Sequence, residues 1–152
     1  MRRYQANGFF PITNPPSLRY WPAAAVDIVK GDALHDDTTG YATNATTAFA
    51  ATFLGIAAED CANSGASKGD LDVAFYPVDH VTQYMVPVAA AALATQTACG
   101  SIVDLEANDD VDLSDTTIAA GPGFYIDEID VSAEAVAANT YGYVIGHFAY
   151  VS

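Results

Sequence analysis

The chain has 152 residues, of which 51% are hydrophobic and 16% are charged, a composition that suits one globular domain with a sizeable core and excludes a disordered chain. Its net charge of −14 is unevenly spread. Residues 1–22 carry three arginines and no acid, for +3, whereas residues 23–152 carry two lysines against nineteen acids, for −17. A body this acidic repels nucleic-acid phosphates and anionic membranes, so we expect no direct binding to either.

Neither a membrane span nor a secretion signal is expected. No apolar run approaches the roughly 18 residues that a spanning helix needs. Arg2 and Arg3 would suit the basic start of a signal peptide, but Asn7, Gly8 and Pro11 break the apolar stretch that should follow.

The first 22 residues predict an extended arm. They contain four of the chain's seven prolines. Each proline lacks a backbone N–H and favours extended geometry in the residue before it, which suits neither a helix nor a central strand. Because arginine and aromatic side chains dominate interface energetics, we expect the arm to bind a partner through Arg2, Arg3, Tyr4, Phe9, Phe10, Arg19, Tyr20 and Trp21. The alternative is that residues 1–22 fold back along their own body and cover an edge strand.

Apolar alternation and turn residues predict a series of short strands in residues 23–152. Leu71, Val73 and Phe75 alternate on one face, for example, and Pro87 indicates an edge or an end of its strand. The small residues of 132–140 suit one short helical turn. In chain order the expected strands are 24–34, 53–57, 70–78, 82–89, 99–105, 124–131 and 141–151, with 41–42 as a possible short one.

The predicted strands repeat with an offset of about 70 residues. Each half has a strand opened by glycine, a polar loop, a strand led by an aromatic residue, a loop of small residues and an aromatic strand. The matching intervals are Gly31 to Phe53 and Gly100 to Phe124, then Phe53 to Val73 and Phe124 to Val144. This offset is too long for a solenoid repeat and predicts two halves of one barrel or sandwich. We therefore expect a single all-β domain, a compact β-sandwich or barrel over residues 23–152, preceded by the arm.

No motif in the sequence indicates an active site. A nucleophile elbow, a phosphate-binding glycine loop and a zinc-ligand spacing are all missing. We expect His35 and His80 in solvated turns, and His147 as a hydrogen-bonded or interface residue of the last strand. Cys61 and Cys99 match no metal or redox spacing, so two free thiols are expected, with a disulfide as the alternative. The prediction is a protein with no catalytic, cofactor-binding or metal-binding residues, and not an enzyme.

One cluster of acids is dense enough to raise the question of calcium. Calcium takes six to eight oxygen ligands. The spacing lacks the central glycine and the terminal glutamate of the EF-hand loop, so we expect a solvated, self-repelling loop instead. The acids are Asp104, Glu106, Asp109, Asp110, Asp112 and Asp115.

Residues 24–151 resemble the capsid decoration, or cement, proteins of tailed bacteriophages. The shared features are a glycine-led strand near the start, "FLGIA" before a loop of small residues, "VPVAA" leading into a second glycine-opened strand, and a late aromatic strand after a run of alanines. The segments that carry the likeness are VDIVKGDAL, FLGIAAED, VAFYPV, VPVAA, CGSIVDL, TTIAAGPGFYIDEI and YGYVIGHF.

The resemblance implies a small β-sandwich or tulip-like barrel on the outer face of an icosahedral head, with no catalytic residues. Such proteins often form trimers at three-fold or pseudo-three-fold positions, and many reach neighbouring capsomers with an extended terminal segment. The expected function is therefore a structural virion protein that binds the major capsid protein at capsomer junctions and stabilises the head. Its other partners would be two copies of itself and neighbouring decoration subunits. The long, basic, proline-rich N-terminus of this chain departs from the family pattern.

Two other functions fit a small β-fold. One is a different virion component, such as a head-fibre base, a tail protein or a neck protein. The other is a carbohydrate-binding module, for which we would expect exposed tryptophan and tyrosine on a groove. Trp21 is the chain's only tryptophan and belongs to the arm, which disfavours sugar binding.

Overall fold

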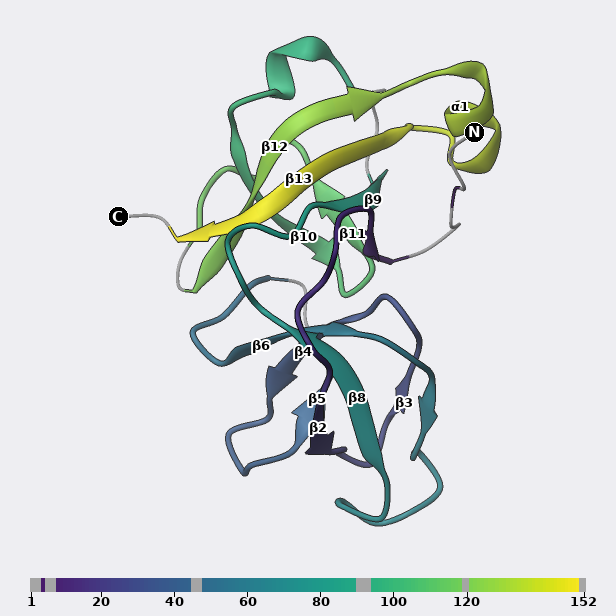
Figure 1. Ribbon diagram of the computed structural model, residues 1–152, viewed down its shortest axis with the longest axis vertical. Coiled ribbons are helices and arrows are strands. Elements are labelled where there is room, and N and C mark those ends of the chain that lie inside the picture. The colour runs from purple at the N-terminus through teal and green to yellow at the C-terminus, as the bar shows by residue number, and fades with distance from the viewer. Residues whose placement is uncertain (1–3, 5–7, 45–47, 90–93, 119–120, 151–152) are drawn as a thin grey trace.

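The computed structural model describes residues 4, 8–44, 48–89, 94–118 and 121–150, and over these residues the chain is almost entirely β-structure. The predicted all-β class is confirmed. Figure 1 shows two lobes, with the C-terminal strands β9 to β13 forming one and strands β2 to β8 forming the other.

The C-terminal lobe is a closed five-stranded barrel. Its strands are neighbours in the order β9-β11-β10-β12-β13, and β13 pairs back with β9. All neighbours are antiparallel except β9 and β11, which run parallel. A 3-10 turn at Gln96–Ala98 follows β9, and the expected helical turn is α1, Ala133–Ala138, between β12 and β13. The strands are β9 (Tyr84–Ala89), β10 (Ile102–Ala107), β11 (Asp110–Asp112), β12 (Pro122–Asp130) and β13 (Tyr143–Tyr150).

The N-terminal lobe has the same strand order. Its sheet runs β2-β8-β6-β4-β5, and a parallel bridge between Ala23 and Ala42 brings the end of β2 beside β5, which closes this sheet too. The strands are β2 (Arg19–Pro22), β4 (Ala33–Asp36), β5 (Ala42–Thr43), β6 (Phe53–Ala57) and β8 (Asp72–Pro77). Three short strands are added: β3 (Asp27–Ile28) pairs with β7 (Cys61–Ala62), and β1 (Phe10–Pro11) pairs with β9.

The registers show that the two barrels are copies of one unit. In β4 and β5, His35 lies opposite Thr43, and in β10 and β11, Asp104 lies opposite Asp112, each residue 69 positions later. The pairs of β4 with β6 recur in β10 with β12 at the same offset of 69. The predicted duplication is therefore real, but the expectation that its halves share one barrel is wrong, because each half closes on itself.

The strand that opens each barrel is equivalent as well. Pro22 lies opposite Asp72 in β2 and β8, and Pro87 lies opposite Tyr143 in β9 and β13. The next residues, Ala23 and Val88, make the parallel contacts that close their barrels. Strand β2 is therefore the counterpart of β9, with Tyr20 equivalent to Met85.

A side-chain contact repeats along with the backbone. Asn63 Nδ2 donates to the carbonyl of Ala23 at 3.2 Å, and Asn139 Nδ2 donates to the carbonyl of the equivalent Val88 at 3.1 Å. In both barrels an asparagine from the loop before the last strand thus ties down the end of the first strand.

One aromatic core joins the barrels. The ring of Phe148 in β13 lies with its centroid 5.1 to 5.6 Å from those of five other rings, and these come from both halves of the chain. They are Phe9, Phe49, Phe53, Tyr84 and Phe124. Burial of each phenylalanine contributes roughly 1.5–3 kcal/mol, so the lobes form a continuous body.

Candidate functional site

The predicted arm folds back on its own chain. Strand β1 pairs with β9 of the C-terminal barrel, and β2 pairs with β8 of the N-terminal barrel. Residues 8–22 therefore follow the alternative of a segment that covers its own sheets, and the expectation of a free arm is corrected for them. Arg2 and Arg3 lie outside the described residues.

Phe9 was expected to fill a pocket on a partner, and instead it is a core residue. Its side chain is 1% exposed, and its ring contacts those of Phe49, Tyr84, Phe124 and Phe148. The backbone holds it there, because the Phe9 N–H donates to the carbonyl of Gly31 at 2.9 Å. The physical reason is that the nearest apolar surface to a proline-broken aromatic segment is its own barrel.

Three more of the predicted anchors are at least partly engaged within the chain. The Tyr4 hydroxyl donates to Asp130 Oδ2 at 2.6 Å, and its ring lies 5.0 Å from that of Tyr143. Trp21 Nε1 donates to the carbonyl of Gly40 at 3.0 Å, and Phe10 is half-buried in β1. These side chains position the segment on its barrels rather than project from it.

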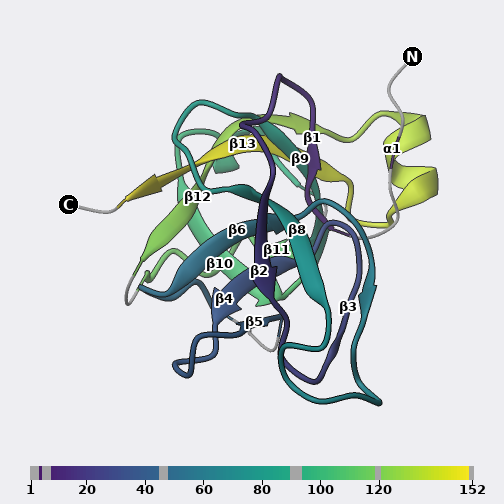
Figure 2. The same cartoon turned by 60° about the horizontal axis from the view of Figure 1, so that its bottom comes forward.

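What remains exposed is the outer side of residues 12–20, here called the β2 surface. Tyr20 is 64% exposed, Leu18 44% and Ile12 40%, while Arg19 is exposed and has no ion pair among the described residues. Figure 2 brings β2 to the front of the N-terminal barrel. Of the eight predicted site residues, only Arg19 and Tyr20 are thus both described and exposed.

Sequence reasoning missed Ile12 and Leu18. Both belong to the same non-helical segment, and Leu18 stands between the paired prolines and Arg19. Residues 12–20 are exposed at almost every position and show no apolar alternation, so the sequence offers no signal that singles out these two.

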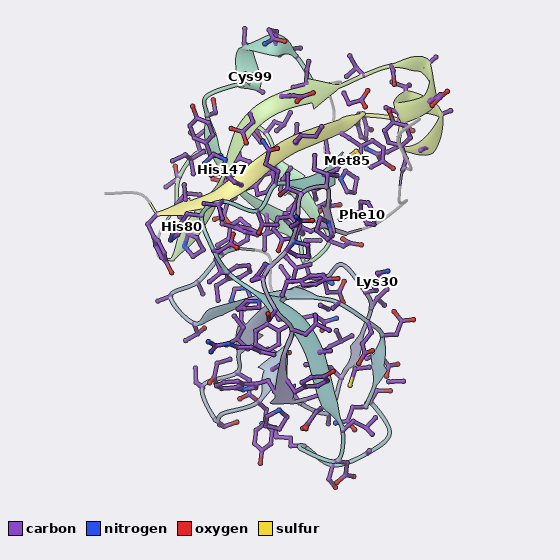
Figure 3. All side chains as sticks on the ribbon, viewed as in Figure 1. Phe10, Lys30, His80, Met85, Cys99 and His147 are labelled. Atoms are coloured by element: carbon purple, nitrogen blue, oxygen red, sulfur yellow. The ribbon has the colours of Figure 1, made fainter. Side chains whose placement is uncertain are left out.

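His147 is hydrogen-bonded, as expected. Its Nδ1 lies 2.8 Å from Asp127 Oδ2, which also accepts from Gln83 Nε2 at 3.1 Å, and its ring lies 5.0 Å from that of Tyr125. His80 is exposed, as expected, with Nδ1 2.9 Å from the carbonyl of Phe148. Figure 3 labels both histidines on the C-terminal barrel.

His35 was expected in a solvated turn, and that expectation is wrong. It is 5% exposed, packs edge-on against Phe53, and its Nε2 has no hydrogen-bond partner in the described structure. Burial lowers the pKa of His35 to about 4, so the ring is neutral at pH 7. The neighbouring Asp36 and Asp37 form the turn, whereas His35 ends the buried run of β4.

The acidic cluster is not one solvated loop. Asp104, the counterpart of His35, is 3% exposed, and its Oδ1 accepts from the N–H groups of Phe49 and Leu105 at 2.7 and 2.8 Å. Burial raises the pKa of Asp104. Burial, followed by the charge of Asp109, raises the pKa of Asp110 to about 6. Among the described residues no three His, Cys, Asp or Glu side chains come together as a metal site.

Both cysteines are free, as expected, with Cys61 buried and Cys99 half-buried. No helix in the described part of the chain is long and apolar enough to cross a membrane. The fold and its exposed segment define the chain as a tandem of two five-stranded β-barrels with a basic, apolar surface along β2. No family model matches the chain, and no curated protein matches it.

Proposed function

We propose that the chain is a structural virion protein, a capsid decoration protein that binds the outer surface of a major capsid shell at capsomer junctions and stabilises the head. The observation that carries the proposal is the β2 surface. Leu18, Arg19 and Tyr20 offer exposed apolar area and a cation that has no ion pair among the described residues, on a chain whose net charge is −14. Aromatic and arginine side chains are the usual anchors of protein interfaces.

The architecture suits such a role. A shell-binding protein needs a rigid body with a defined contact surface, and the shared core of the two barrels holds the N-terminal segment in place through Phe9. The acidic remainder favours solubility and limits unspecific association of a protein made in many copies. Three copies around a three-fold position would present three β2 surfaces, and repeated weak contacts add up on a closed shell.

Mixing the full-length protein with undecorated heads tests the proposal. We expect cosedimentation with the heads, a higher temperature of head disruption, and a trimer mass in solution or on the head. Deletion of residues 1–22 is not a suitable variant, because it removes Phe9 from the core.

The sharper variant is Leu18→Ser with Tyr20→Ser, which changes only exposed side chains. The matched control is Val29→Ser with Tyr150→Ser, two residues that are 54% and 58% exposed elsewhere on the molecule. We expect the first pair to weaken head binding and the control pair to leave it unchanged. Equal binding by both pairs, or no binding by the unmodified protein, would contradict the proposal.

A further inference from the structure

Strand β9 has neighbours along both of its edges. Strand β13 lies on one side, and β11 and β1 share the other. The Ile12 N–H donates to the carbonyl of Gln83 at 2.9 Å. Because hydrogen-bonded pairs alternate along an antiparallel ladder, Phe10 and Met85 form the next such pair, and Pro11, which has no N–H, falls between them. Phe10 of β1 therefore pairs with the outward N–H and C=O of Met85. Figure 3 labels these two residues.

The same alternation shows which groups of β2 face outward. The Ala23 N–H donates to the carbonyl of Leu71 in front of β8, at 2.9 Å. Counting back along the ladder, Trp21 and Arg19 also bond to β8, whereas Tyr20 does not. The N–H and C=O of Tyr20 thus point away from the barrel, as do those of Leu18. Pro22 falls at an outward position, where a missing N–H costs no bond to β8.

Tyr20 is the counterpart of Met85, but among the described strands nothing equivalent to β1 lies beside it. In the described structure, no strand pairs with the outer edge of β2 between Leu18 and Tyr20. The side chains differ in the same way, since Met85 is 1% exposed and Tyr20 is 64% exposed. One barrel therefore has its first strand covered, and the other presents the matching edge to solvent.

We infer that this edge binds an extended segment of a partner protein, which adds an antiparallel strand to β2 as β1 does to β9, with an acidic side chain beside Arg19. Unpaired strand edges recruit extended segments through backbone hydrogen bonds, and side chains set the specificity. The acidic character of the partner residue beside Arg19 follows from the register in which β1 pairs with β9. Pro11 of β1 lies opposite Tyr84, whose counterpart in β2 is Arg19. A residue in the place of Pro11 would have its Cβ about 5 Å from that of Arg19.

A second copy of the chain is a poorer occupant, because its own open β2 edge carries no acid to place beside Arg19. The one described segment that covers such an edge is β1, and its neighbour Phe9 is locked in the core of its own molecule. Every strand of the C-terminal barrel already has two neighbours. If the proposed function is correct, the segment that pairs with β2 belongs to the shell protein. Only this identification of the partner rests on the proposed function, and the open edge itself does not.

Peptides test the edge without the shell. The probes are synthetic peptides of residues 8–13, GFFPIT, with Pro11→Glu or Pro11→Lys, added to the full-length protein at low salt. We expect the Glu peptide to shift the amide NMR signals of Leu18 and Tyr20 at ~1 mM, a concentration that detects weak binding. The Lys peptide should bind roughly two- to fivefold more weakly, the size of an exposed ion pair. An Arg19→Glu variant should reverse this preference.

The variant Tyr20→Pro should block peptide pairing with β2, because it removes an outward N–H and leaves the hydrogen bonds between β2 and β8 intact. We expect it to fold and to lose the peptide-induced shifts. No shift at Leu18 and Tyr20 with either peptide, unchanged binding by Tyr20→Pro, or an unchanged preference in Arg19→Glu would overturn the inference. Peptide binding without head binding would instead reject the proposed function and leave the edge site standing.

Discussion

The two barrels have the same strand order and registers, but their first strands are covered differently. In the C-terminal barrel, β1 pairs with β9 at Met85. The Met85 side chain is buried in a small cluster with Ala135 of α1, Tyr143 and Ile145, on which Tyr4 packs. In the N-terminal barrel the counterpart, Tyr20, is largely exposed. The unit therefore folds with its first strand either covered or open. An open edge that the fold tolerates is available for binding.

The largest expected effect comes from the residue that ties the covered strand to the core. Phe9→Ala should lower the free energy of unfolding by about 3–5 kcal/mol, because it removes a buried ring from the aromatic cluster. Tyr20→Ala, at an exposed aromatic of the open strand, should change it by less than about 0.5 kcal/mol. Urea denaturation of both variants measures the contrast. A small effect of Phe9→Ala would mean that the N-terminal segment is not part of the core.

His35 and Asp104 occupy equivalent positions in the two barrels, and substitutions at them should affect stability differently. Asp104→Ala leaves the buried N–H of Phe49 without its acceptor and should cost about 1–3 kcal/mol. His35→Phe removes a ring nitrogen that has no partner in the described structure and keeps the contact with Phe53, so it should be neutral or stabilising at pH 7. Thermal unfolding of the two variants at pH 7 measures both effects on stability. Strong destabilisation by His35→Phe would show that the imidazole has a partner.

Asp110 in the C-terminal barrel and His35 in the N-terminal barrel should change the stability of the fold in opposite directions as the pH falls. Asp110 has a raised pKa of about 6, so its charge destabilises the fold above pH 6, and this penalty disappears as the pH falls towards 4. His35 has a lowered pKa of about 4, so its burial costs stability as the pH falls from 6.5 to 4. In the unmodified protein these two contributions oppose each other.

Single variants separate them. Because Asp110 is half-exposed and solvent screens it, Asp110→Asn should gain no more than about 1 kcal/mol at pH 7, and the gain should vanish near pH 4. The gain from His35→Phe should instead grow as the pH falls below 6.5. Melting temperatures from pH 4 to 7.5 measure both. Parallel curves for the variants and the unmodified protein would refute the assigned pKa shifts.

Most strands of the two barrels, the helical turn and the duplication could be predicted because their signals are local. Strands β1, β2, β7 and β11 were not expected, and the expected strand 24–34 is divided between β3 and β4. Gly31 and Gly100 open equivalent strands, and apolar alternation marks the strands that follow. Closure of each half could not be predicted, because it depends on contacts such as Ala23 with Ala42, two small residues with no distinctive pattern.

The candidate site was predicted only in part for a similar reason. An aromatic residue among prolines, such as Phe9, looks the same whether it packs on its own barrel or on a partner. His35 was misplaced because the acids that follow it belong to a turn, while its own position belongs to a buried strand. Arg19 and Tyr20 are exposed in the structure, while their role in binding a partner stays a prediction.

Amide hydrogen exchange at the two equivalent positions tests the central claim most directly. The account predicts that the Met85 N–H, which pairs with β1, exchanges slowly, and that the Tyr20 N–H exchanges orders of magnitude faster although its neighbours Arg19 and Trp21 are protected by β8. Addition of a peptide that binds the edge should slow amide exchange at Tyr20 and leave exchange at Arg19 and Trp21 unchanged. Equal protection of Met85 and Tyr20 in the free protein would contradict an open edge on β2.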